Sequence, residues 1–121
     1  MNIAEALQQI NYAVDRAHSR HITVGFGQIM VYNEKAEEAA DYVAAKYPEN
    51  LSGFPLIAVE VAVTDKAAKE VADDIISSRS KWLSLSTEIE KVRLRGKYQI
   101  RTSDANIEMV VEETIKALDA I

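Results

Sequence analysis

Five basic side chains within one short segment are the residues of this chain best suited to chemistry. Residues 91–101 alternate basic and apolar positions, and the basic ones are Lys91, Arg93, Arg95, Lys97 and Arg101. Because side chains alternate across a β-strand, the pattern predicts a strand with one apolar face and one cationic face. Arginine recognises planar carboxylates and phosphates through paired hydrogen bonds, so such a face suits an acidic partner. The same charges also fit a solvated sheet face or an edge strand protected from aggregation.

The rest of the chain is acidic. The 121 residues hold 14 basic and 19 acidic side chains, so removing the five leaves 9 bases against 19 acids elsewhere. A net charge of −5 disfavours bulk electrostatic binding to nucleic acid. Sheet platforms for nucleic acid also stack bases on exposed aromatic rings, and the alternation places Tyr98 on the apolar side. Nucleic acid is therefore a disfavoured partner.

Glu60 interrupts the apolar run of residues 55–63, which predicts a central strand. An isolated carboxylate in a dry sheet is costly, so we expect it to pair with Arg93 or Arg95 on the same face. Such a pair is either structural or part of a polar pocket, where a perturbed carboxylate would be a candidate general base. Nothing else in the sequence completes a catalytic site, so we assign no catalytic residue and no cofactor.

Trp82 and two histidines complete the candidate residues. Trp82 is the single tryptophan and follows Lys81, so it is either an interface anchor or a core residue. Asp15, His18 and His21 have the spacing of a metal site on a helix. Histidines near a helix C-terminus also interact favourably with the helix dipole, and we predict no metal.

The elements that would position these residues alternate between helices and strands. We expect one helix over 2–19 and another from Asn33 to Tyr47. Two further helices follow caps at Thr64 or Asp65 and at Ser103. We expect strands over 21–32 and 55–63. Residues 82–90 fit both a helix and a strand, and Ser84, Ser86 and Thr87 favour the strand. The third strand region, 82–101, is long enough to bend near Glu90 or to turn at Gly96.

Together these elements predict an α+β fold. We expect a two-layer sandwich in which helices cover one face of a mixed or antiparallel sheet of three to five strands, forming a single domain over 1–121. The chain has no cysteine, no hydrophobic leader and no apolar run of membrane-spanning length. We therefore expect a cytoplasmic protein without a membrane partner.

Two classes of function are consistent with these observations. The first is a non-enzymatic interaction or assembly module whose cationic sheet face or edge strand contacts a second copy or an acidic protein. The second is a small-molecule-binding domain or small enzyme with a polar pocket near Glu60 that recognises an anionic or polar ligand. The acidic last helix and the cationic segment favour the first class, because opposite charges in one chain permit self-association.

Overall fold

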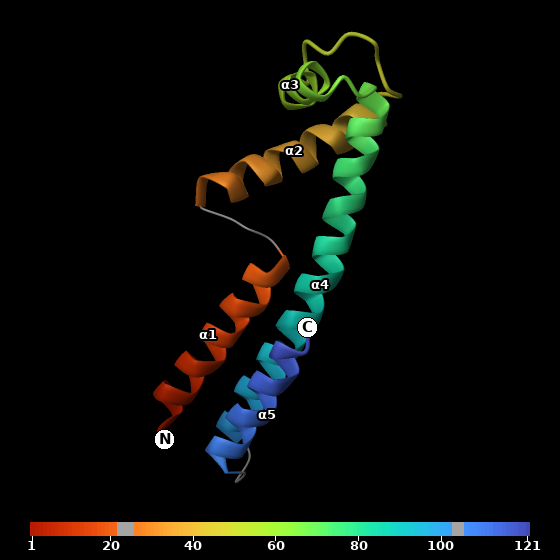
Figure 1. The fold of residues 1–121 in the computed structure, drawn as a ribbon. Coiled ribbons are helices and arrows are strands. Elements are labelled where there is room, and N and C mark those ends of the chain that lie inside the picture. Colours follow the sequence, from red (N-terminus) through yellow and green to blue (C-terminus); the bar gives the residue numbers. More distant parts are fainter. Residues whose placement is uncertain (22–25, 103–105) are drawn as a thin grey trace. The chain divides into compact units, whose positions relative to one another are not determined.

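The computed structural model describes residues 1–21, 26–102 and 106–121. These residues form five α-helices and no β-strand (Figure 1). The helices are α1 (Ile3–His21), α2 (Phe26–Ala44), α3 (Pro55–Thr64), α4 (Ala68–Thr102) and α5 (Ile107–Asp119). The predicted α+β sandwich is therefore wrong, and the described chain is all-α.

The long helix α4 replaces the expected third strand region. Its buried side, Leu85, Ile89, Val92, Gly96 and Ile100, recurs every three or four residues, which is the period of a helix. Leucine, glutamate, lysine and arginine also have high helix propensity and make up half of residues 82–101. The basic residues at odd positions alternate as in a strand. The buried residues, however, recur at helical spacing, and their packing determines the structure.

Helix α3 replaces the expected central strand. Pro55 occupies its first turn, where the missing N–H costs nothing. Ile57 is fully buried and Val61 packs beside the same core four residues later, whereas Val59 and Val63 are 61% and 79% exposed. A strand would place all four on one face, so the packing of only two of them against the core selects the helical period.

Several other predicted boundaries of helices and strands also differ from the structure. The predicted strand 21–32 is replaced by α2 from Phe26 onward, while residues 22–25, including Gly25, lie outside the described residues. Asn33 lies inside α2 and caps nothing, and Asp65 closes α3 with a φ of 59°. The expected cap Ser103 also lies outside the described residues, and Asn106 caps α5 through its side-chain oxygen. The first helix is confirmed with slightly different ends.

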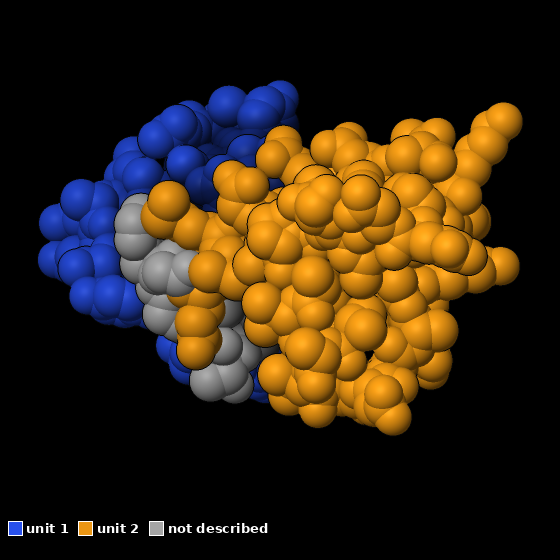
Figure 2. Space-filling model, turned by 90° about the horizontal axis from the view of Figure 1, so that it is seen from above, with its two compact units in different colours: residues 1–23, 83–121 blue, residues 24–82 orange. Residues whose placement is uncertain are grey.

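The chain divides into two compact units, coloured separately in Figure 2. Unit 1 comprises Met1–Thr23 and Leu83–Ile121, and unit 2 comprises Val24–Trp82. Helix α4 contributes its first part to unit 2 and the rest to unit 1. The single-domain expectation stays a prediction.

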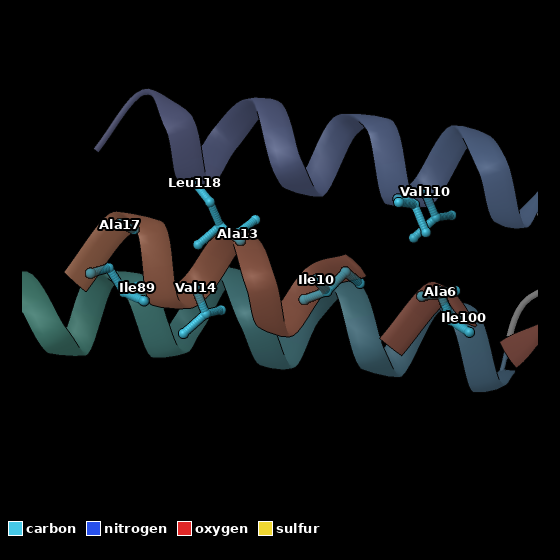
Figure 3. Packing of buried hydrophobic residues seen from close by; sticks show 10 residues of the cluster. Ala6, Ile10, Ala13, Val14, Ala17, Ile89, Ile100, Val110 and Leu118 are labelled. Atoms are coloured by element: carbon cyan, nitrogen blue, oxygen red, sulfur yellow. The ribbon is translucent and has the colours of Figure 1, made fainter. Parts of the chain in front are cut away.

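Unit 1 is a three-helix bundle of α1, the later part of α4, and α5. Helices α1 and α5 run in the same direction, and α4 runs against both (Figure 1). Small side chains on α1 allow close packing, and the fully buried alanines are Ala6, Ala13 and Ala17. Figure 3 shows these facing Ile89 and Ile100 of α4 and Val110 and Leu118 of α5. This apolar interior fixes which sides of α4 and α5 remain outside.

Unit 2 packs α2, α3 and the start of α4 around an aromatic cluster. The Tyr42 ring meets the rings of Tyr47 and Phe54 edge to face, with centroids 5.8 and 5.1 Å apart. Ile57 and Val71 are fully buried beside it. The Glu38 carboxylate accepts hydrogen bonds from the backbone N–H groups of Leu56 and Ile57, so α2 supplies the cap that Phe54 lacks.

Candidate interaction surface

The five basic residues of the predicted cationic face lie on α4 in unit 1, where the helix distributes them over different sides. At about 100° per residue, Lys91 and Arg101 point away from the core, Arg95 and Lys97 lie at its two borders, and Arg93 lies closest to it. In the structure, Lys91, Arg95 and Arg101 are exposed, whereas Arg93 and Lys97 are partly buried. The single cationic sheet face expected from the sequence therefore does not exist.

Two large apolar side chains share the outer side with the three exposed cations. Leu94 is 51% exposed and Tyr98 is 69% exposed. Lys91, Leu94, Arg95, Tyr98 and Arg101 fall within an arc of about 120° on the helix surface, and we call this set the outer α4 patch. The sequence pattern had placed Tyr98 and Leu94 opposite the basic residues, because a strand alternates sides and a helix does not.

The cations of the outer α4 patch lack acidic partners in the part of the chain that the structure describes. Within residues 1–21, 26–102 and 106–121, no carboxylate lies within 4.0 Å of Lys91, Arg95 or Arg101. Within those ranges their charges are unpaired, and they lie beside two exposed apolar side chains.

Arg93 forms an ion pair within its own helix. Its Nε and Nη2 donate to the two carboxylate oxygens of Glu90 at 2.8 and 2.6 Å. This paired geometry lowers the pKa of Glu90, chiefly through the hydrogen bonds and then through the positive charges of Arg93 and Lys97. Arg93 therefore stabilises α4 locally and adds little to the outer surface.

Gly96 brings α4 close to its two neighbours in unit 1. A Cβ atom at this position would lie 2.7 Å from Thr114 Oγ1 and 3.3 Å from Ile10 Cδ1. Thr114 is buried and its hydroxyl donates to the Val110 carbonyl at 2.7 Å. The missing side chain thus fixes the rotation of α4, and with it the direction in which the outer α4 patch faces.

A second surface of unit 1 carries the opposite charge. Helices α1 and α5 border a groove of about 720 Å³, and its apolar floor includes Val111 and Ile115. Among the described residues, three carboxylates line it, those of Glu108, Glu112 and Asp119, and Lys116 is its one basic side chain. We call this the acidic groove. It was not identified from the sequence, although the acidic character of the last helix was a partial signal.

Some of these carboxylates have partners within unit 1. Glu108 lies 2.9 Å from the Met1 ammonium, which lowers the pKa of the carboxyl, chiefly through that hydrogen bond. Asp119 lies 3.7 Å from Arg16 and 3.8 Å from Arg20, both longer than a strong ion pair. Among the described residues, Glu112 has no cation within 4.0 Å. Glu112 is therefore the groove charge most available to a partner.

Glu60 has a different partner from the expected arginine. Its carboxylate accepts from Lys35 Nζ at 3.0 Å, and both side chains are about one-third exposed or less. They border a cavity of about 280 Å³ in unit 2, which Tyr32, Lys66, Asp74 and Ser78 also line. The sequence identified the carboxylate that needs a partner but not the partner, because Glu60 was placed on a strand beside Arg93 and Arg95, whereas it lies on helix α3 and meets Lys35 of α2.

Trp82 and the histidines are the remaining candidate residues. Trp82 is partly buried on α4 at the last residue of unit 2, and its role as an anchor stays a prediction. His21 Nε2 lies 2.8 Å from the carbonyl oxygen of Ile121. Throughout the ranges that the structure covers, no group of three or more metal-binding side chains is placed to hold an ion.

No protein-family model, curated protein or solved structure matches this chain. None of the helices in the described ranges combines the length and the apolar character needed to cross a membrane.

Proposed function

We propose that this protein is an interaction module whose outer α4 patch binds an acidic amphipathic helix. One observation carries the proposal: Leu94 and Tyr98 are exposed among three cations that have no acidic partner in the described residues. Exposed tyrosine and arginine are typical anchors of protein interfaces, because they combine apolar area with hydrogen bonding. The module keeps the interaction role expected from the sequence, with a helix surface in place of the sheet face.

The chain's charge favours a protein partner over nucleic acid. Three cations and one aromatic ring form a short patch on a chain of net charge −5. Nucleic-acid grooves neutralise many phosphates and stack several bases. An acidic helix needs only a few ion pairs and an apolar seam, which is what the outer α4 patch offers.

Fluorescence anisotropy tests this proposal. The probe is a labelled acidic amphipathic peptide with leucines at helical spacing, compared with a scrambled peptide of the same composition and with a single-stranded oligonucleotide. We expect the helical peptide to bind, and binding to weaken as salt rises from about 50 to 300 mM because exposed ion pairs are screened. Absence of peptide binding, or tighter binding of the oligonucleotide, contradicts the proposal.

Charge reversal locates the surface. Lys91→Glu with Arg95→Glu should weaken peptide binding by about tenfold, because two attractions become repulsions. Arg79→Glu with Lys81→Glu is the matched control, since both residues are exposed on α4, outside the outer α4 patch. Equal loss in both variants would show a general charge effect and would remove the assignment to the outer α4 patch.

A second function is favoured by the cavity beside Glu60. Two ion pairs border it, Lys35–Glu60 at 3.0 Å and Lys66–Asp74 at 3.5 Å. Its volume, about 280 Å³, equals roughly nine water molecules, so a ligand there would have the size of an amino acid. A zwitterion can match both a lysine and a carboxylate, whereas a ligand of one charge meets a like charge as well.

Ligand-observed NMR separates this second function from the first. Free α-amino acids serve as probes, with succinate and putrescine as controls of single charge. Binding of an amino acid that Glu60→Gln weakens supports the cavity, and Glu49→Gln is the control on an exposed carboxylate outside it. Equal or absent signals for all three ligand types would remove this function.

A further inference from the structure

We propose that the outer α4 patch of one molecule docks in the acidic groove of a second copy of this chain. The inference rests on the proposed function and names its partner. The two surfaces lie in the same helical bundle, unit 1, but belong to different helices. Each has an apolar centre and charged margins, and the charges are opposite.

The charges of the two helices are matched in number. Residues 83–102 of α4 hold Glu88 and Glu90 against five bases, a balance of +3, and α5 holds four acids against Lys116, a balance of −3. Complementary potentials of this kind steer association and select the partner. Pairing two outer α4 patches would instead place like charges together, which disfavours a symmetric dimer through α4.

The acidic groove is shallow and open to solvent, so a helix can approach it. Ile115 of the acidic groove is partly exposed and offers an apolar contact for Leu94 or Tyr98 of the incoming helix, whereas Val111 is buried beneath it. Glu112, which has no ion pair among the described residues, lines the same groove and can meet Arg95 or Lys91. The incoming α4 would join α1 and α5 across the groove, as helices pack in a four-helix bundle.

This contact is head to tail, and it leaves a free surface at each end. One molecule in the contact keeps its acidic groove unoccupied and the other keeps its outer α4 patch exposed. Such heterologous interfaces build rings or open chains of molecules rather than closed dimers. The inference therefore predicts assemblies that grow with concentration.

Two complementary variants test the contact. Arg95→Ser with Tyr98→Ser removes the α4 side, and Glu112→Lys removes the groove side; all three positions are exposed, so circular dichroism should show unchanged helix content. We expect each variant alone to be monomeric by light scattering coupled to size exclusion. Their equimolar mixture should form a heterodimer that does not grow, because only one productive surface pair remains.

Glu113→Lys is the matched control for the groove. It makes the same charge change on the adjacent α5 residue, which does not line the groove, so this variant should assemble as the wild type does. A mixture that stays monomeric, or equal loss of assembly in Glu112→Lys and Glu113→Lys, would overturn the inference. Peptide binding by the monomeric wild type would then leave the proposed function standing, whereas loss of both would end the two together.

Discussion

At the scale of single residues, Gly96 sets how closely three helices approach. A Cβ atom there would lie 2.7 and 2.8 Å from Thr114 Oγ1 and Cγ2, inside normal contact distance. Alanine would improve helix propensity by about 1 kcal/mol, but overpacking a filled core costs about 1–3 kcal/mol. Packing should therefore outweigh propensity, and the glycine is a requirement of the bundle.

Chemical unfolding of Gly96→Ala checks this argument. We expect the free energy of unfolding to fall by about 1 kcal/mol, and the loss to shrink or reverse in a Thr114→Ala background, because the clash is then gone. Gly53→Ala is the control, since a Cβ atom on that loop residue would have no neighbour within 4 Å. If Gly96→Ala increases the free energy of unfolding while Thr114 is unchanged, the close approach is refuted.

The Glu90–Arg93 pair predicts a defined pH response. The carboxyl pKa of Glu90 is lowered from 4.5 in the folded state. The pair therefore stabilises the fold fully above the ordinary carboxyl pKa, and this contribution is lost as pH falls through the lowered value. Carboxyl NMR titration should give Glu90 a midpoint below 4.5 that rises in Arg93→Gln, and an unchanged midpoint in that variant would contradict the assignment.

At the scale of elements, helix α3 depends on a cap from another helix. The carboxylate of Glu38 accepts hydrogen bonds from Leu56 N and Ile57 N at 2.9 and 3.2 Å. Hydrogen bonds to a charged group contribute about 1.5–3 kcal/mol, so Glu38→Ala should lower the melting temperature and increase hydrogen exchange in α3. Glu37→Ala, on the exposed neighbour, should leave exchange in α3 unchanged. Equal protection of α3 in both variants would argue against the cap.

Lys116 offers a change expected to strengthen the proposed assembly. In the part of the chain that the structure describes, it is the one basic side chain lining the acidic groove, and it would repel the incoming cations of α4. Lys116→Gln should shift self-association to lower concentration by a few-fold, because one repulsion is removed at a rim position. Weaker association of this variant, measured by light scattering, would show that the groove does not receive a basic surface.

The helices could be predicted from sequence only where one periodicity was present. The first helix has apolar residues at helical spacing and no competing alternation, and its prediction is confirmed as α1. Residues 91–101 satisfied a strand pattern through their charges and a helix pattern through Val92, Gly96 and Ile100. Burial decides between them, and burial depends on α1 and α5, which are distant in sequence. The sequence analysis therefore grouped the side chains of residues 91–101 by the alternation of a strand, whereas helix α4 groups them differently.

At the scale of the whole molecule, charge is separated within a single bundle. Unit 1 places the cations of α4 and the carboxylates of α5 on different surfaces, although the chain has only a modest net charge of −5. Internal pairing accounts for Arg93 and, in part, for Asp119. The cations of the outer α4 patch and Glu112 have no ion-pair partner among the described residues, and in the proposed assembly a second molecule would supply the complementary surface.

Sedimentation of the wild-type chain at several concentrations tests this account most directly. At low ionic strength, we expect an average mass above the 13.5 kDa of one chain that rises with concentration without a plateau at the dimer. High salt should return the mass to one chain, because the contacts join exposed charges that salt screens. A mass of 13.5 kDa at every concentration and salt would contradict the proposed assembly.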